Sequence, residues 1–567
     1  MAGWPRRGCQ EAWVACAARE RLPNSFGDEW GDWVKQAQEI IKGIDERPPD
    51  SGSLGGWSRL VGECHLRNLN CLVAVLRPNG VVHPLRRLRE SVLSERTIDI
   101  IERRIGDSIM REIYKDPDYL DDPLLGEQVQ QIWSRLMVAA RERGELSAEL
   151  QQRFAWEVSL IRDPSVNAFA LPGGYLGVHL GLMATVANRH ELASVLAHEL
   201  THVTQRHIAR LMSRQNQQSP LLMGAMLLAI LAASKSPTAG TAMISGGQAL
   251  AIQNQLNFSR DMEREADRVG FGVMADAGFD TQGFVGMFEK LQIAARLNDR
   301  GNYPYLRSHP LTTERIADMQ LRQPGLAQPK PALVDWDDVL TGARARALVQ
   351  TGVEGMRRLS EAAQDSDLPT YAPHRQAAVL YAAVLSDLRL KQAQPAQLKL
   401  ERLGPLLATA APVWWRGVRA EVALYTGQAQ AAVDVLQGQL SRQSRSEVLW
   451  LAQARLALGQ VSQCTAASQE LGAWMLERPR DTLAWSLLSQ ALQCQGKTLR
   501  AICAQAQVHW LQHDLTGAQD RLRAAQALVQ QKTRDGQMER GDHIEASIID
   551  ANLRELDSLR REQLLQR

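Results

Sequence analysis

One helical stretch, "ASVLAHELTHVTQRH" at residues 193–207, constrains the fold of this chain more than any other feature. His198 and His202 are four residues apart, so on a helix both imidazoles lie on one face and can bind one metal ion together. Glu199 lies one step around the helix, where its carboxylate reaches a water molecule activated by the metal. The helix carries a broad apolar surface, and two buried histidines without partners would be energetically costly. The pattern therefore predicts a zinc-dependent peptidase with a third metal ligand elsewhere in the chain.

A second predicted helix contains the candidate third ligand. In "DMEREADRVG", Glu263 and Asp267 are four residues apart and share one face. A carboxylate suits the third position, and a carboxylate one turn further along can hold a ligand histidine in the required tautomer. We therefore expect Glu263 to bind the metal and Asp267 to support catalysis by contacting a histidine, with His202 as the expected partner. Glu265 is the competing candidate, but it projects from a different face of the helix than Asp267.

Two apolar stretches before the motif helix predict strands. "RFAWEVSLI" is typical of one strand, and "NAFALPGGYLGVHLGLM" predicts a strand–turn–strand around Pro172, Gly173 and Gly174. We expect Asn167, Gly173 and Gly174 to mark the edge strand of the active site, because zinc peptidases of this type hold extended substrates against such an edge. Together with the helical patterns from about residue 93 onward, these strands predict an α+β peptidase domain with a small sheet.

The chain is long enough for several domains. Its 567 residues are too many for one core. The Pro-rich stretch "RQPGLAQPKPA" predicts a linker, and almost everything after about Trp336 predicts helices. We expect an uncertain N-terminal segment, a zinc peptidase domain, a linker and a helical repeat domain, at residues 1–92, 93–321, 322–335 and 336–567. The predicted fold is mainly α, with an all-α domain after the α+β domain.

The C-terminal region contains a loose internal repeat. Gly427, Gly459 and Gly496 each end a predicted helix, at spacings of 32 and 37 residues, and a small residue follows five positions after each glycine. Glycine allows a turn between paired helices, and the small residue allows the helices to pack closely. The spacing is typical of a tetratricopeptide array, whose period is about 34 residues. An undifferentiated helical bundle is the alternative.

Two further segments stand apart from these domains. Residues 1–92 hold five of the fourteen tryptophans and have no apolar run long enough for a secretory signal. We expect that this segment is not part of the mature protein. The most apolar stretch, "PLLMGAMLLAILAAS" at residues 220–234, has fifteen residues, fewer than the roughly 20 that span a bilayer. It predicts a buried helix or, alternatively, a membrane-surface or re-entrant segment.

Four motifs of this chain resemble those of the M48 family of zinc peptidases, of the gluzincin type. They are "NAFALPGG", "HELTH", "EREAD" and "SHPLTTERIADM", and the resemblance runs from roughly Ile105 to Met319. It implies one Zn²⁺ per chain, with Glu263 as a ligand and Asp267 as the aspartate that ends the family's E-x-x-A-D pattern. Together with the helical repeats, the resemblance implies a periplasmic enzyme of Gram-negative bacteria that hydrolyses misfolded or stalled outer-membrane β-barrel proteins.

His309, in "RSHPLTTERI", precedes a proline that favours an extended backbone. An ordinary surface histidine is one interpretation. As a functional residue, it would either stabilise an oxyanion or serve as a fourth zinc ligand that keeps the enzyme latent. We favour the fourth ligand, because a catalytic zinc requires an open fourth position that this residue would close. His207, five residues after His202, is expected to lie off the ligand face and to cap or solvate the helix.

Charge and resemblance together predict the partners. A net charge of +2 without long single-sign runs argues against nucleic-acid binding. The zinc-peptidase motif and the resemblance make polypeptides the expected substrates. The resemblance adds the outer-membrane β-barrel assembly machinery as a partner. In the periplasm, Cys464 and Cys494, which lie in adjacent predicted repeats, would form a disulfide. The alternatives are a chaperone or assembly scaffold with latent proteolysis, and a peptidase attached to the membrane, integrally or peripherally, through residues 220–234.

Overall fold

The computed structural model describes residues 82–214, 260–296, 303–322, 334–437, 444–539 and 541–564. The chain divides after Ile98, and its second unit comprises residues 99–567. Residues 1–81 of the predicted N-terminal segment, the apolar stretch 220–234 and residues 323–333 of the predicted linker lie outside the described residues. Within the described ranges, no helix is both long and apolar enough to cross a membrane.

A four-stranded sheet with the order β1-β2-β4-β3 organises the N-terminal part of the second unit. The strands are β1 (Tyr119–Leu120), β2 (Glu157–Ile161), β3 (Ala168–Leu171) and β4 (Tyr175–His179). β2 is parallel to β4, whereas β3 pairs antiparallel with β4 and places Phe169 opposite Gly177. Gly173 and Gly174 form the turn between β3 and β4 with φ angles of 79° and 81°, a conformation that favours glycine. The predicted strand and strand–turn–strand are confirmed, and β3 lies at an edge of the sheet.

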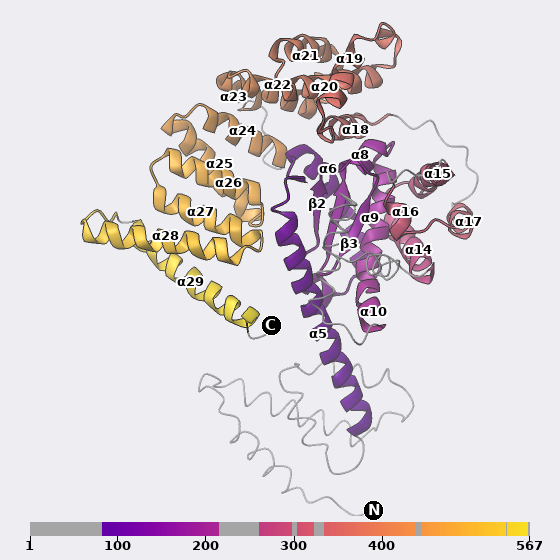
Figure 1. The fold of residues 1–567 in the computed structure, drawn as a ribbon, viewed down its shortest axis with the longest axis horizontal. Coiled ribbons are helices and arrows are strands. Elements are labelled where there is room, and N and C mark those ends of the chain that lie inside the picture. Colours follow the sequence, from indigo (N-terminus) through magenta and orange to yellow (C-terminus); the bar gives the residue numbers. More distant parts are fainter. Residues whose placement is uncertain are drawn as a thin grey trace, which may run out of the picture. The chain divides into compact units, whose positions relative to one another are not determined.

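Helices pack on this sheet and on one another, with α6, α8 and α9 in contact with its strands (Figure 1). In chain order they are α5 (Val82–Ile113), α6 (Pro123–Glu142), α7 (Ala148–Arg153), α8 (Leu180–Thr185), α9 (Arg189–Thr204), α10 (His207–Arg214), α14 (Arg260–Asp276), α15 (Gln282–Arg296), α16 (Tyr305–Ser308) and α17 (Thr313–Leu321). Apolar side chains of α6, α9, α14, α15 and the sheet share one core, in which Trp133 and Leu136 of α6 are fully buried. This core fixes α9, which carries the motif of the sequence analysis.

Helix α9 begins at a capped residue and is buried along its length. The Asn188 side chain accepts hydrogen bonds from the backbone N–H groups of His190 and Glu191, donors that the first turn of a helix leaves without partners. α14 crosses α9 closely at Gly270, where an added Cβ would lie 3.1 Å from the carbonyl carbon of Ala197. The close approach places the acidic face of α14 opposite the histidine face of α9.

The C-terminal part of the unit consists of helices that pack on their neighbours in chain order (Figure 1). They are α18 (Trp336–Leu348), α19 (Val353–Glu361), η2 (Ala362–Gln364), η3 (Leu368–Thr370), α20 (Pro373–Arg389), α21 (Ala393–Leu407), α22 (Pro412–Tyr425), α23 (Ala429–Gln437), α24 (Arg445–Ala457), α25 (Val461–Glu477), α26 (Thr482–Cys494), α27 (Thr498–Leu511), α28 (Leu515–Arg534) and α29 (Asp542–Leu564). The predicted fold class, mainly α with a small sheet and a helical C-terminal region, is confirmed. The tetratricopeptide assignment stays a prediction.

Two sequence features of this helical region behave as expected. Gly427, Gly459 and Gly496 have φ angles of 75°, 66° and 73°, the left-handed conformation in which glycine commonly ends a helix. A disulfide joins Cys464 of α25 to Cys494 of α26, with 6.2 Å between their Cα atoms, so the predicted pairing is confirmed. The glycine turns thus connect consecutive helices, and the disulfide links α25 to α26 covalently.

The helical region joins the sheet region at the start of α6. Asp122 caps α6 and accepts hydrogen bonds of 2.8 and 2.7 Å from the guanidinium of Arg344 in α18. Leu124 packs in the core of the helical region, whereas Leu125 packs in the core around the sheet. The first turn of α6 is therefore shared by both cores, and the position of a boundary between two domains stays a prediction.

Two helical glycines provide a matched test of this packing. Gly106 of α5 faces the β3–β4 turn, where an added Cβ would lie 2.0 Å from the carbonyl oxygen of Pro172, whereas at Gly126 of α6 the nearest atom would be 3.5 Å away. We expect Gly106→Ala to lower the free energy of unfolding by about 1–3 kcal/mol through overpacking, and Gly126→Ala to raise it by up to about 1 kcal/mol. Urea unfolding midpoints measure both effects, and equal midpoints would contradict the packing of α5 on this turn.

Candidate metal centre

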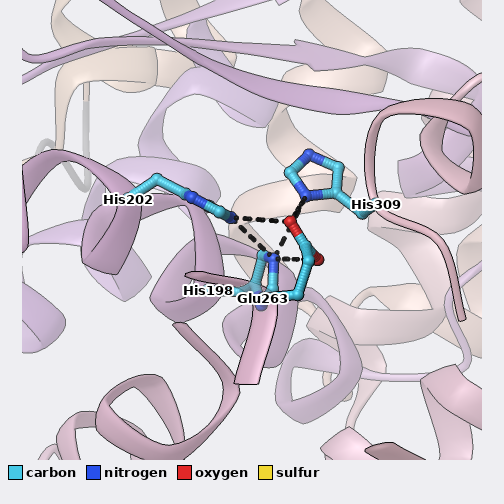
Figure 2. Close-up of side chains that lie close together, drawn as sticks. All are labelled: His198, His202, Glu263 and His309. Atoms are coloured by element: carbon cyan, nitrogen blue, oxygen red, sulfur yellow. Dashed lines mark hydrogen bonds and ion pairs between the residues drawn. The ribbon is translucent and has the colours of Figure 1, made fainter. Parts of the chain in front are cut away.

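Four side chains from three segments meet where α14 crosses α9 (Figure 2). His198 and His202 come from α9, Glu263 comes from α14, and His309 directly follows α16. His202 Nε2 lies 3.0 Å from His198 Nε2, and His309 Nδ1 lies 3.0 Å from Glu263 Oε1. One potential ligand atom from each residue lies within 4.8 Å of those of the other three. The structure thus brings the predicted ligands and His309 into one group.

The chemistry of this group fits a zinc ion. All four side chains are buried, and two imidazoles with one carboxylate form a donor set that is common in catalytic zinc sites. Within the described part of the chain, the buried oxygens Glu199 Oε1 and Glu263 Oε2 make no hydrogen bond. Their nearest charged neighbours are His309 Nε2, 3.4 Å from Glu199 Oε1, and the Arg315 guanidinium, 2.9 Å from Glu263 Oε2. Buried carboxylate oxygens require compensation, which a divalent cation among these ligands supplies.

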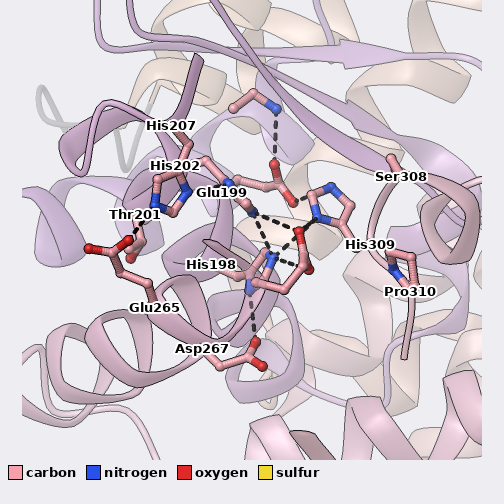
Figure 3. Close-up of polar contacts among 12 residues, drawn as sticks. His198, Glu199, Thr201, His202, His207, Glu265, Asp267, Ser308, His309 and Pro310 are labelled. Atoms are coloured by element: carbon pink, nitrogen blue, oxygen red, sulfur yellow. Dashed lines mark hydrogen bonds and ion pairs between the residues drawn. The ribbon is translucent and has the colours of Figure 1, made fainter. Parts of the chain in front are cut away.

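Glu199 lies beside the group with its two oxygens in different surroundings (Figure 3). Oε2 accepts a hydrogen bond of 2.9 Å from the backbone N–H of Ala170 in β3, and Oε1 lies 3.4 Å from His309 Nε2. Burial raises the pKa of Glu199 above its usual value, which suits a carboxylate that must accept a proton near neutral pH and release it again. The edge strand therefore orients the predicted general base.

Asp267 contacts a ligand histidine, but not the predicted one. Its Oδ1 lies 2.9 Å from His198 Nδ1, so the expected contact with His202 is wrong. The helix crossing explains the difference: Gly270 of α14 lies against Ala197 and His198, and the adjacent turn of α14 therefore faces the first histidine. Because a carboxylate only accepts hydrogen bonds, Nδ1 of His198 carries the proton of this contact, and Nε2 faces the group.

His202 is oriented by His207, a residue that the helical pattern placed elsewhere. His207 Nδ1 lies 2.8 Å from His202 Nδ1, and His207 Nε2 lies 3.0 Å from Glu265 Oε2. Glu265 accepts from His207 Nε2, so His207 Nδ1 accepts from His202 and leaves His202 Nε2 available to a metal. The expectation that His207 caps or solvates the helix is wrong. α9 ends at Thr204, and Arg206 has a left-handed φ of 59°. The periodicity of α9 therefore does not predict where the side chain of His207 points.

Glu265, the competing candidate for the third ligand, lies outside the metal group. Its contacts are with His207 and Arg210. A second residue not predicted from the sequence is Arg315, which lies in the quoted motif "SHPLTTERIADM". Its buried guanidinium contacts both Asp267 and Glu263.

Buried charges set the protonation of the ligands. Burial and the neighbouring His198 hold the pKa of His202 well below its usual value, so this imidazole is neutral. Burial alone would raise the pKa of Glu263, but His309 and His198 hold it well below its usual range. Burial also opposes the charged form of His198, yet hydrogen bonds with Asp267 and Glu263 raise its pKa to about 9. Zinc binding at neutral pH therefore has to release a proton from His198.

His309 lies between the ligand carboxylate and the base. Its backbone N–H donates to the Tyr305 carbonyl at 2.9 Å, and its ring stacks on the Tyr305 ring with 4.6 Å between centroids. Its Nδ1 also lies 3.3 Å from His198 Nε2. The side chain is buried, so the interpretation as an ordinary surface histidine is wrong.

The residues predicted to mark the substrate edge lie at the two ends of β3. The carbonyl of Asn167 accepts a hydrogen bond of 3.1 Å from the backbone N–H of His179. Gly173 lies in the turn at the other end, where an added Cβ would be 2.8 Å from Arg103 Cα, and Gly174 lies equally close to Phe154. These residues shape the strand and its turn. The binding of substrate along β3 stays a prediction.

Comparisons with known proteins find similar peptidases. The model of peptidase family M48 matches residues 123–323. The Beta-barrel assembly-enhancing protease of Yersinia pestis is 31% identical over 429 residues, which cover 76% of this chain and 84% of that protein. The protein of the same name from Escherichia coli is 30% identical over 433 residues, which cover 76% of this chain and 84% of that protein. The Mitochondrial metalloendopeptidase OMA1 of Saccharomyces cerevisiae is 30% identical over 200 residues, which cover 34% of this chain and 55% of that protein.

The contact between Asp267 and His198 provides a test by metal affinity. We expect Asp267→Ala to weaken zinc binding by about 10–100-fold, because the ligand imidazole loses the carboxylate that orients it. Competition with a chromophoric chelator measures the affinity. Asp261→Ala is the matched control on the same helix, since Asp261 is exposed and contacts Arg264. Equal affinities of the two variants would contradict a role of Asp267 at the metal.

Proposed function

The chain belongs to peptidase family M48, and from this premise we propose that it hydrolyses misfolded or stalled outer-membrane β-barrel proteins in the periplasm. The proposal is supported by two relatives named as β-barrel assembly-enhancing proteases, of which this chain covers 84%. The disulfide between Cys464 and Cys494 supports an oxidising compartment. We propose the outer-membrane β-barrel assembly machinery as a partner and the C-terminal helices as its docking region.

The activity is that of a zinc metalloendopeptidase. We propose that His198, His202 and Glu263 hold the ion, since they form the buried group described above. When bound there, zinc supplies Lewis-acid activation of a water molecule and of the scissile carbonyl. Glu199 accepts the proton of the attacking water through Oε1, which makes no hydrogen bond with the described residues, and passes it to the leaving amine. The position of this buried carboxylate oxygen beside three converging ligands is the observation that carries the proposal.

The substrate would bind as an extended chain beside β3. The strand lies at the edge of the sheet, so its outward main-chain groups are placed to pair with a polypeptide. The backbone N–H of Ala170 is already bonded to Glu199, which puts the base directly beside the bound chain. Recognition through the main chain suits a protease whose substrates are unfolded and differ in sequence.

We assign His309 as a fourth ligand that keeps the enzyme latent. The assignment is supported by its position within 4.8 Å of the other ligand atoms and by its burial. The same observation favours a second candidate function, a chaperone or assembly scaffold whose proteolysis is normally closed. The two functions differ in whether an inactive variant still supports β-barrel assembly.

The general base is tested by replacing Glu199 with its amide. We expect Glu199→Gln to reduce the digestion of casein by at least about 100-fold, because an amide cannot accept the proton of the attacking water. The zinc content, measured by elemental analysis, stays at one ion per chain because Glu199 is not a ligand. Wild-type protein with and without chelator is the control. Equal digestion by wild type and variant would refute the catalytic assignment.

The proposed fourth ligand is tested by removing its side chain. We expect His309→Ala to digest casein faster than wild type, and a tenfold increase would correspond to about 1.4 kcal/mol of closing free energy removed. The rate and the zinc content are measured on the same preparation. Loss of activity with zinc retained would contradict gating and would support the alternative that His309 stabilises the oxyanion.

A further inference from the structure

Arg315 of α17 is a buried cation behind the metal group. Its guanidinium binds Asp267 in a fork, with Nε donating to Oδ2 at 2.6 Å and Nη2 donating to Oδ1 at 2.8 Å. The residue is only 3% exposed, and Asp267 is only 1% exposed. A two-point contact of this kind fixes the plane of the carboxylate as well as its position. Asp267 in turn holds His198, so Arg315 acts on one ligand through one intermediate.

The remaining nitrogen of Arg315 contacts the two other parts of the site. Nη1 lies 2.9 Å from Glu263 Oε2, and it also donates a hydrogen bond of 2.9 Å to the carbonyl of Pro310. Pro310 is the residue directly after His309. One rigid guanidinium therefore touches the carboxylate that orients His198, the ligand carboxylate Glu263 and the backbone that carries His309.

Arg315 also contacts two residues of the short connection between α16 and α17. The backbone N–H of Arg315 donates to the side chain of Thr312, the N-cap of α17, while its side chain reaches back to Pro310. On the other side, His309 is held by the carbonyl and the ring of Tyr305. The short connection can thus be displaced only if the contact between Arg315 and Pro310 lengthens or breaks.

We propose that Arg315 is a positioning residue that couples His309 to the metal carboxylate, and so sets both the zinc affinity and the strength of latency. The proposal rests on the assignment of His309 as a fourth ligand. Arginine is required because its fork reaches three acceptors at once. A lysine offers the same charge at one point and cannot hold Asp267, Glu263 and Pro310 in one plane.

Replacement of Arg315 is best tested in the Glu199→Gln protein, where self-digestion is avoided. We expect Arg315→Lys and Arg315→Met to bind zinc about 10–100-fold more weakly, as does loss of other groups that support metal ligands. Arg322→Met is the matched control, because Arg322 lies just after the same helix, is exposed and contacts only Asp318 among the described residues. The absorption spectrum of the cobalt-substituted protein then reports whether His309 remains a ligand.

Thermal unfolding separates positioning from mere structural support. If Arg315 is only structural, Arg315→Met lowers the unfolding temperature by the same amount with and without zinc. If Arg315 positions the ligands, the variant shows a smaller rise in unfolding temperature when zinc is added. Because Arg315→Met leaves a buried carboxylate without its partner, the double variant Arg315→Met/Asp267→Asn is measured beside it. Unchanged zinc affinity and an unchanged cobalt spectrum in Arg315→Lys would overturn the proposal.

A final comparison distinguishes this proposal from the assignment of His309. In a protein with active Glu199, Arg315→Lys is expected to raise the turnover of zinc-saturated enzyme when His309 is present and to have no such effect in a His309→Ala background. Dependence of this kind is measured as a double-mutant cycle. An equal effect in both backgrounds would refute the coupling, even if His309→Ala by itself speeds digestion as expected.

Discussion

Three carboxylates and three imidazoles lie buried together where α14 crosses α9, and the balance of their charges constrains everything around them. Glu199, Glu263 and Asp267 are each at most 1% exposed, and a buried carboxylate without compensation costs several kcal/mol. Arg315 compensates two of them, and a divalent ion among the imidazoles compensates the remaining charge. The close approach at Gly270 is what brings these groups together. The helix crossing forms the metal site, and the buried carboxylates that it brings together in turn require a cation.

Features set by local spacing could be predicted from the sequence, and the convergence of Glu263 with His198 and His202 agrees with the resemblance to the M48 family. Individual contacts set by the helix crossing could not be predicted. The positions of His198 and His202 four residues apart, the strand–turn–strand and the glycine turns all follow from local periodicity and are present in the structure. The partner of Asp267 depends on which turn of α9 lies opposite it. The packing of Gly270 against Ala197 fixes this turn, and these two residues are far apart in the sequence. His207 escaped prediction because the helix ends before it, at a left-handed Arg206. Arg315 escaped because arginine is so often a surface residue that its motif alone does not indicate burial.

The first turn of α6 ties the helical C-terminal region to the site. Leu124 belongs to one core and Leu125 to the other, and Asp122 between the regions is held by the buried Arg344. Because α6 also packs against α9 and α14, displacement of the helical region would strain the helices that carry the ligands. The C-terminal helices therefore share packing contacts, through α6, with the helices that carry the proposed ligands.

The location of His309 suits the latency that we propose for this site. His198, His202 and Glu263 lie on long helices that form the core, but His309 lies on the short connection between α16 and α17. Tyr305 on one side and Arg315 on the other contact this connection locally, and His309 itself reaches Glu263 of α14. Withdrawal of His309 therefore requires movement of only a few residues, while the metal ligands and Glu199 keep their positions. In the proposed assignment, the three ligands and the residue that closes the fourth position belong to separate elements, so the fourth position could open without loss of the ion.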